Sequence, residues 1–139
     1  MKTILILFSA VALALLPAAC GPGEGTGRKV IKSAQAGNNL TVSLSTSDGV
    51  VKRGNTEFTL SFTDAAGKTI DVGGVALIFH MPQMGTMAEM NDAASFTTTE
   101  TPGVYRGKAN VQMAGEWQVR ITYEGPHGRG QASFPVTVQ

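Results

Sequence analysis

The stretch Trp117-Gln-Val-Arg-Ile-Thr-Tyr123 alternates apolar and polar side chains without interruption. Successive side chains of a β-strand point to opposite faces, so the four apolar residues of this stretch would lie together on one face. This pattern is typical of a strand that covers a hydrophobic core with one face and meets solvent with the other. No part of the sequence has the pattern of a long amphipathic helix, and no internal repeat is visible.

Further strands are expected along the chain, separated by turn-forming residues such as those of Asp64–Gly67 and Gly125–Pro126. Val75–Phe79 is almost continuously apolar, which predicts a central strand covered on both faces. With this strand and Trp117–Tyr123, about seven short strands predict an all-β fold, an immunoglobulin-like antiparallel β-sandwich. The other five expected strands are Leu40–Ser45, Phe58–Phe62, Ser95–Thr99, Tyr105–Val111 and Ala132–Val138.

Residues 1–19 have the features of a bacterial lipoprotein signal peptide. Lys2 gives a short positive start, and Ile4–Leu16 is an apolar run too short for a confident membrane span. The small residues that follow lead to Cys20, which resembles the lipidated cysteine of a lipobox, with Pro17 where an aliphatic residue usually stands. The alternative is an ordinary signal peptide with an incidental cysteine.

Lipidation of Cys20 would anchor the protein to the cell membrane or the outer membrane, outside the cytoplasm and facing the periplasm. Gly21 is not the aspartate of inner-membrane retention, which favours the outer membrane. Residues 20–38 are assigned to the lipidated cysteine and a flexible tether, because residues 21–27 read Gly-Pro-Gly-Glu-Gly-Thr-Gly. Residues 39–139 are assigned to one folded domain, since the roughly 110 residues that follow the glycine-rich stretch are too few for two.

The composition excludes several kinds of function. Cys20 is the only cysteine, so its lipidation would leave no thiol for disulfides, nucleophilic catalysis or zinc binding. The chain has eleven basic and ten acidic residues, and removal of Lys2 with the signal leaves ten of each. A formally neutral mature protein gives no indication of nucleic-acid binding.

Four methionines and a histidine lie in the short stretch His80-Met-Pro-Gln-Met-Gly-Thr-Met-Ala-Glu-Met90. Six methionines occur in the whole chain, and only Met113 of the mature part lies outside this stretch. A thioether is a soft, neutral ligand that selects monovalent copper over hard cations. The stretch therefore predicts a copper(I) site. Its candidate metal ligands are His80, Met81, Met84, Met87 and Met90.

The four methionines recur at every third position, so an α-helix could not hold all of them on one face. A loop or an extended, three-fold segment could bring them together at the end of the Val75–Phe79 strand. Met113 is a second-tier metal ligand because it precedes a turn, and His127, in another turn, is a second-tier ligand as well. The alternative is that these methionines form an apolar cap or a docking patch for a partner.

Four segments of the chain resemble the YtkA-like (FixH-related) domain family, in the same order and over roughly residues 41–138. They are Phe62–Leu77, with its Asp-x-x-Gly-Lys start, Met81–Gly85, Gly103–Gly107 and Met113–Trp117. The resemblance implies a small extracytoplasmic β-sandwich, similar to parts of copper-efflux adaptors and of proteins near haem–copper oxidase assembly.

The sequence contains no Gly-x-Ser-x-Gly elbow, P-loop or His-Glu-x-x-His motif, and its two histidines are far apart, so we expect a protein that is not an enzyme. The expected function is that of a membrane-anchored copper(I) chaperone or copper-homeostasis factor. Its partners would be the membrane, through the lipid anchor, and a copper donor or acceptor such as an efflux pump or an oxidase-assembly protein. The alternative is a structural or interaction module of an envelope complex that docks through its methionine-rich loop.

Overall fold

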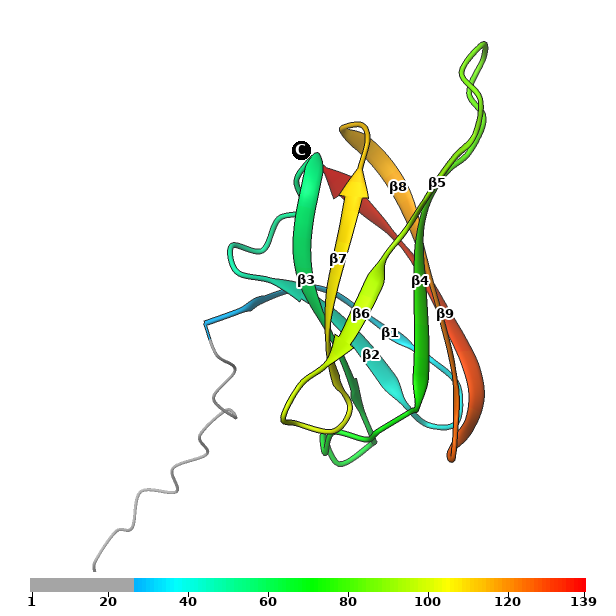
Figure 1. Cartoon of the computed structure of the whole chain (residues 1–139). Coiled ribbons are helices and arrows are strands. Elements are labelled where there is room, and N and C mark those ends of the chain that lie inside the picture. The colour runs from blue at the N-terminus through cyan, green and yellow to red at the C-terminus, as the bar shows by residue number, and fades with distance from the viewer. Residues whose placement is uncertain (1–26) are drawn as a thin grey trace, which may run out of the picture.

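The computed structural model describes residues 27–139 as two facing antiparallel β-sheets (Figure 1). The expected signal peptide, Cys20 and most of the expected tether lie outside the described residues. One sheet has the strand order β1-β2-β3-β7-β6, and the other has the order β5-β4-β8-β9. The strands are β1 (Lys29–Gln35), β2 (Thr41–Thr46), β3 (Gly54–Thr63), β4 (Gly74–Met81), β5 (Met90–Ala93), β6 (Ser95–Thr98), β7 (Val104–Val111), β8 (Gly115–Gly125) and β9 (Gly128–Val138).

The two sheets confirm the expected all-β sandwich, and the seven expected strands correspond to β2, β3, β4, β6, β7, β8 and β9. The two additional strands lack the alternation on which the sequence-based prediction depended. β1 is an edge strand, mostly exposed and irregular between Val30 and Lys32, and it lies inside the range 20–38 that was assigned to the tether. β5 has only four residues and pairs with the end of β4.

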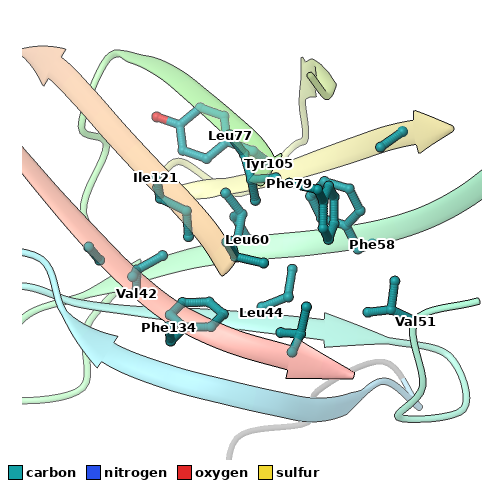
Figure 2. Close-up of a cluster of buried hydrophobic side chains, with 14 of the residues drawn as sticks. Val42, Leu44, Val51, Phe58, Leu60, Leu77, Phe79, Tyr105, Ile121 and Phe134 are labelled. Carbon is teal, nitrogen blue, oxygen red and sulfur yellow. The ribbon is translucent and has the colours of Figure 1, made fainter. Parts of the chain in front are cut away.

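The core lies between the two sheets and is built mainly by alternate residues of β2, β3, β4, β7, β8 and β9 (Figure 2). Phe58 of β3 contacts Phe79 of β4 edge to face, with ring centroids 5.9 Å apart, so this aromatic pair joins the two sheets. Phe62 makes a similar contact with Tyr123 of β8 at 5.4 Å. Such pairs add about 0.5–1.5 kcal/mol beyond the burial of their apolar area. Both sheets and this core lie within residues 29–138.

β4 is central in its sheet, but it is not covered on both faces as its apolar sequence predicted. Leu77 and Phe79 are buried, whereas Ile78, between them, is 40% exposed. The outer face of this sheet carries no covering layer among the described residues, so β4 alternates like the other strands. An apolar run therefore did not distinguish a doubly covered strand from one that exposes an isoleucine.

The segment from Met90 to Thr98 passes from one sheet to the other. Its first part, β5, pairs with β4, and its second part, β6, pairs with β7. Ala94 lies between the two, and its backbone N–H donates to the Leu77 carbonyl at 3.0 Å. This crossing fixes the start of β5 beside the end of β4 and so determines where the methionine-rich segment leaves the sandwich. Within residues 27–139 no helix is long and apolar enough to cross a membrane.

Candidate functional site

The methionine-rich segment forms the loop of a β-hairpin, which is the first of the two predicted arrangements, and it is not an extended, three-fold segment. Met81 is paired with Met90 where β4 meets β5, and residues 82–89 form the rest of the hairpin. Every residue from Pro82 to Glu89 is exposed. In Figure 1 the hairpin between β4 and β5 extends well beyond the ends of the two sheets. The segment is therefore accessible from most directions.

A tight turn at the tip of this hairpin holds Met84 and Met87 opposite each other. The Met84 N–H donates to the Met87 carbonyl at 3.2 Å, and the Met87 N–H donates to the Met84 carbonyl at 2.9 Å. Gly85 has a φ of 58°, which a two-residue hairpin turn requires at its first central position. Residues that exchange both hydrogen bonds have Cα atoms about 5.5 Å apart and side chains on the same face of the ribbon.

The four clustered methionines fall into two pairs with different surroundings. Met84 and Met87, the tip pair, are 55% and 41% exposed. Met81 is only 3% exposed and belongs to the core, and Met90 is half-buried and packs against it. Pro82, which has no N–H, follows Met81 and interrupts the ladder between the two pairs. The structure thus presents two thioethers to solvent and keeps the other two at the base of the hairpin.

His80 lies at the base of the hairpin, on the face of β4 opposite to Met81. Its Nδ1 is 2.8 Å from the Oδ1 of Asn91, its partner in β5. An amide oxygen accepts a hydrogen bond, so in the neutral imidazole this contact places the proton on Nδ1 and the lone pair on Nε2. Metal-binding histidines are commonly oriented in this way by an oxygen on the other ring nitrogen. The sequence analysis did not identify Asn91, because only the pairing of β4 with β5 brings it beside His80.

Met113 approaches the same end of the sandwich, as expected from its position before a turn. The side chain of Gln112 donates to Asp92 at 2.8 Å, and the Gln112 backbone N–H donates to the other Asp92 oxygen at 3.1 Å. These bonds attach the β7–β8 turn to β5. They also give the carboxylate of Asp92, which is only 8% exposed, its hydrogen-bond partners. The Met113 carbonyl accepts a hydrogen bond from the Trp117 indole at 3.0 Å, and the Met113 side chain packs partly against the core.

His127 lies in the β8–β9 turn, next to the end of β4 that starts at Gly74, whereas the hairpin leaves from the other end of β4. Eight strand residues span about 26 Å, so His127 and the methionines cannot bind the same ion. The structure therefore does not bring this second-tier residue to the other candidates.

The end of the sandwich near His127 is fixed by hydrogen bonds around Tyr105. Its hydroxyl lies 3.0 Å from both the Asp71 carboxylate and the Gly73 carbonyl, and it accepts from the Val72 N–H at 3.3 Å. The Gly73 N–H and the Tyr105 hydroxyl hold the pKa of Asp71 below its usual range. Burial, together with the Asp71 carboxylate, raises the pKa of Tyr105. These polar groups are engaged in structural bonds.

Among residues 27–139, no group of three or more His, Cys, Asp or Glu side chains is arranged to hold a metal ion. Hard cations and zinc prefer such groups. Several candidate ligands were predicted from the sequence. Among them, the two thioethers of the tip pair are both exposed and lie on the same turn. Their chemistry is that of weak, soft, uncharged donors, which matches monovalent copper and no common hard cation.

The sequence model of the YtkA-like family matches residues 34–122 of this chain, which is more than half of its length. The matched range runs from the end of β1 into β8 and includes the whole methionine hairpin. No curated protein and no solved structure gave a significant match. The match agrees with the resemblance that the four sequence segments indicated.

Proposed function

This chain belongs to the YtkA-like family, and from that premise we propose that it is an extracytoplasmic copper(I)-binding protein, anchored to a membrane through Cys20. The observation that carries this proposal is the tip pair: Met84 and Met87 face solvent on opposite strands of one tight turn. A copper(I) ion that approaches the hairpin meets two preorganised thioethers. We propose binding and delivery of copper, and no enzymatic reaction.

The location of the tip pair suits delivery better than storage. Thioethers are neutral, so they bind copper(I) more weakly than thiolates do, and a partner with thiolate or additional thioether ligands can remove the ion. The exposure of all residues from Pro82 to Glu89 gives such a partner room to approach. An efflux pump or an oxidase-assembly protein that accepts copper would have the required chemistry. His80, through its Nε2, would serve as a secondary ligand that binds the copper(I) ion transiently at the base of the hairpin.

The proposed anchor would hold the hairpin near a membrane partner. Cys20 lies nine positions before Lys29, the first residue of β1, and a fully extended chain covers about 3.3–3.6 Å per residue. The sandwich would therefore stay within about 30 Å of the bilayer surface while the tether lets it turn. Metal transfer to an integral membrane partner would then occur between two proteins confined to the same surface, which raises their effective concentration.

The test is a copper(I) titration of residues 21–139 against a chromophoric chelator, comparing wild type with the double variant Met84→Leu/Met87→Leu. Leucine keeps the volume and the apolar character but removes the sulfur, so the fold should be unchanged. We expect wild type to compete for copper(I) and the double variant to lose at least about tenfold in affinity. The matched control is Met113→Leu, the same substitution at the same end of the sandwich, which should keep wild-type affinity.

A second function, docking to an envelope complex, is favoured by the same exposed hairpin, since exposed apolar side chains often mark interaction sites. The two proposals make opposite predictions for the titration. A docking module would show no competition for copper(I) in wild type, and its partner binding would survive the change of methionine to leucine, because leucine preserves the apolar surface. Competition that persists in the double variant would reject the tip pair and leave copper binding at another position.

A further inference from the structure

We infer that one copper(I) ion joins two copies of this chain tip to tip, with Met84 and Met87 of each copy supplying four thioether ligands. This inference rests on the proposed function and adds the partner that completes the site. One tip has too few ligands for a copper(I) ion. Copper(I) bound by weak thioethers takes about three or four of them, and the tip of one hairpin offers two.

The other three thioethers of residues 27–139 lie in the core or pack against it. Met81 is 3% exposed and fills the core, with its terminal methyl group 3.4 Å from where a side chain on Gly115 would start. Met90 and Met113 are half-buried and pack against the core. Withdrawing any of them toward the tip would leave a cavity in a closely packed interior, and deletion of a buried methionine side chain typically costs about 2–5 kcal/mol.

His80 is a poor substitute for a third ligand at the tip. It lies four residues before Met84, which is about 13 Å along an extended strand. Its ring is also held by the 2.8 Å hydrogen bond to Asn91, which fixes it beside β5 at the base of the hairpin. The distance and the hydrogen bond both keep His80 away from the tip. The tip pair therefore still lacks one or two ligands.

A second copy meets the requirements of the tip pair. A two-fold axis through the ion would place the same two thioethers on its other side, which is the self-complementary arrangement of most homodimers. The hairpin extends beyond the sheets (Figure 1), so two tips can meet while the two sandwiches remain apart. Charge does not oppose the contact: Glu89 is the only charged residue from Met81 to Met90, and the chain after the signal carries ten basic and ten acidic residues.

The contact itself is too small to hold two chains together without metal. Each tip consists of a few exposed residues around Gly85, whereas stable interfaces bury about 800 Å² on each partner. Dimers should therefore form only when copper(I) is present and should dissociate when a chelator removes it. The link would be reversible, as a protein that passes its copper to a partner requires.

The experiment is sedimentation equilibrium of residues 21–139 under anaerobic conditions, with and without copper(I), at several protein concentrations. We expect a monomer without metal and about twice that mass with copper(I), reached at about one copper for every two chains. X-ray absorption should show sulfur ligands only. The variant Met84→Leu/Met87→Leu should remain monomeric with copper(I), and the control Met113→Leu should dimerise like wild type.

Three results would overturn the inference. A monomer that binds about one copper(I) per chain through Met84 and Met87 would show that the site is completed within one chain or by solvent, and it would leave the proposed function intact. A copper-dependent dimer that persists in Met84→Leu/Met87→Leu would place the link elsewhere. Absence of copper(I) binding in wild type would reject the proposed function together with the inference.

Discussion

The two ends of the sandwich use their side chains in opposite ways. At the end near Gly74, the hydroxyl of Tyr105 is bonded to Asp71, Val72 and Gly73, and these groups hold the loops in place. At the other end, the hairpin carries Met84 and Met87 into solvent, where they are 55% and 41% exposed. Groups engaged in structural bonds are not free to bind a ligand, which is why the proposed copper site lies at the second end.

The same contrast exists within the hairpin itself. Met81 and Met84 are three residues apart, yet the first is 3% exposed and the second 55%. Residue type alone therefore does not decide the role of a methionine in this chain.

Truncation of Met81 should be far more costly than truncation at the tip. Met81→Ala removes a core side chain and should lower the free energy of unfolding by about 2–5 kcal/mol. Met84→Ala and Met87→Ala should change it by no more than about 0.5 kcal/mol, because both side chains are largely exposed. Urea denaturation of the three variants measures the difference. Equal costs at the three positions would contradict the division of the hairpin into base and tip.

Removal of the Tyr105 hydroxyl should weaken the opposite end. Tyr105→Phe leaves the N–H of the fully buried Val72 without its partner, which should cost about 1–3 kcal/mol of unfolding free energy and leave copper(I) affinity unchanged. Tyr123→Phe is the matched control, because the Tyr123 hydroxyl accepts from the exposed Asn38 side chain, which can turn to water. Thermal denaturation and copper titration of both variants test the prediction, and a loss of copper affinity in Tyr105→Phe would break the assignment of the two ends.

Gly85→Ala should weaken the tip without affecting the core. The φ of 58° is unfavourable for alanine by about 1–2 kcal/mol, and the space around the new side chain is open, so the cost arises in the turn itself. Copper(I) affinity should fall by about fivefold or more, since 1.4 kcal/mol corresponds to a factor of ten. Thr86→Ala, at the next position, should bind like wild type. Unchanged affinity in Gly85→Ala would mean that the turn does not preorganise the two thioethers.

The coupling between Asp71 and Tyr105 should be visible in a tyrosine titration. Burial and the carboxylate raise the pKa of Tyr105, so its contribution to stability is complete below about pH 10 and is lost as the pH rises through the folded-state value. Asp71→Asn removes the negative charge and should let Tyr105 ionise at lower pH, as ultraviolet absorbance will show. The pKa of Asp71 is lowered, so its contribution holds above about pH 4 and is lost as the pH falls below it.

The copper(I) affinity of the tip pair should not change with pH. A thioether carries no proton between pH 7 and pH 5, so a site made of Met84 and Met87 keeps its affinity over this range. An imidazole binds a metal only when the coordinating nitrogen carries no proton, so a site that included one would weaken in acid. Competition titrations at several pH values separate the two ligand sets. A clear loss of affinity at pH 5, absent from His80→Gln, would move the site from the tip to the base of the hairpin.

Much of the fold could be predicted from alternation along the strands. Trp117–Tyr123 is part of β8, and its four apolar residues are all buried. β1 and β5 could not be predicted in the same way, because β1 is exposed on most positions and β5 is too short to show a period. The expected double cover of Val75–Phe79 failed because an apolar run does not reveal whether another layer packs on its outer face.

The chemistry of the candidate site can be predicted from the chain's residues alone: four soft thioethers lie in one short segment, with a glycine that permits a tight turn. Which of these thioethers reach solvent depends on the fold. Residues Met90–Thr98 cross from one sheet to the other, which places β5 beside β4. Met81 and Met90 therefore pack in or against the core, whereas Met84 and Met87 remain exposed. The physical reason is that burial depends on what packs against a residue, and residues far away in the chain supply that packing.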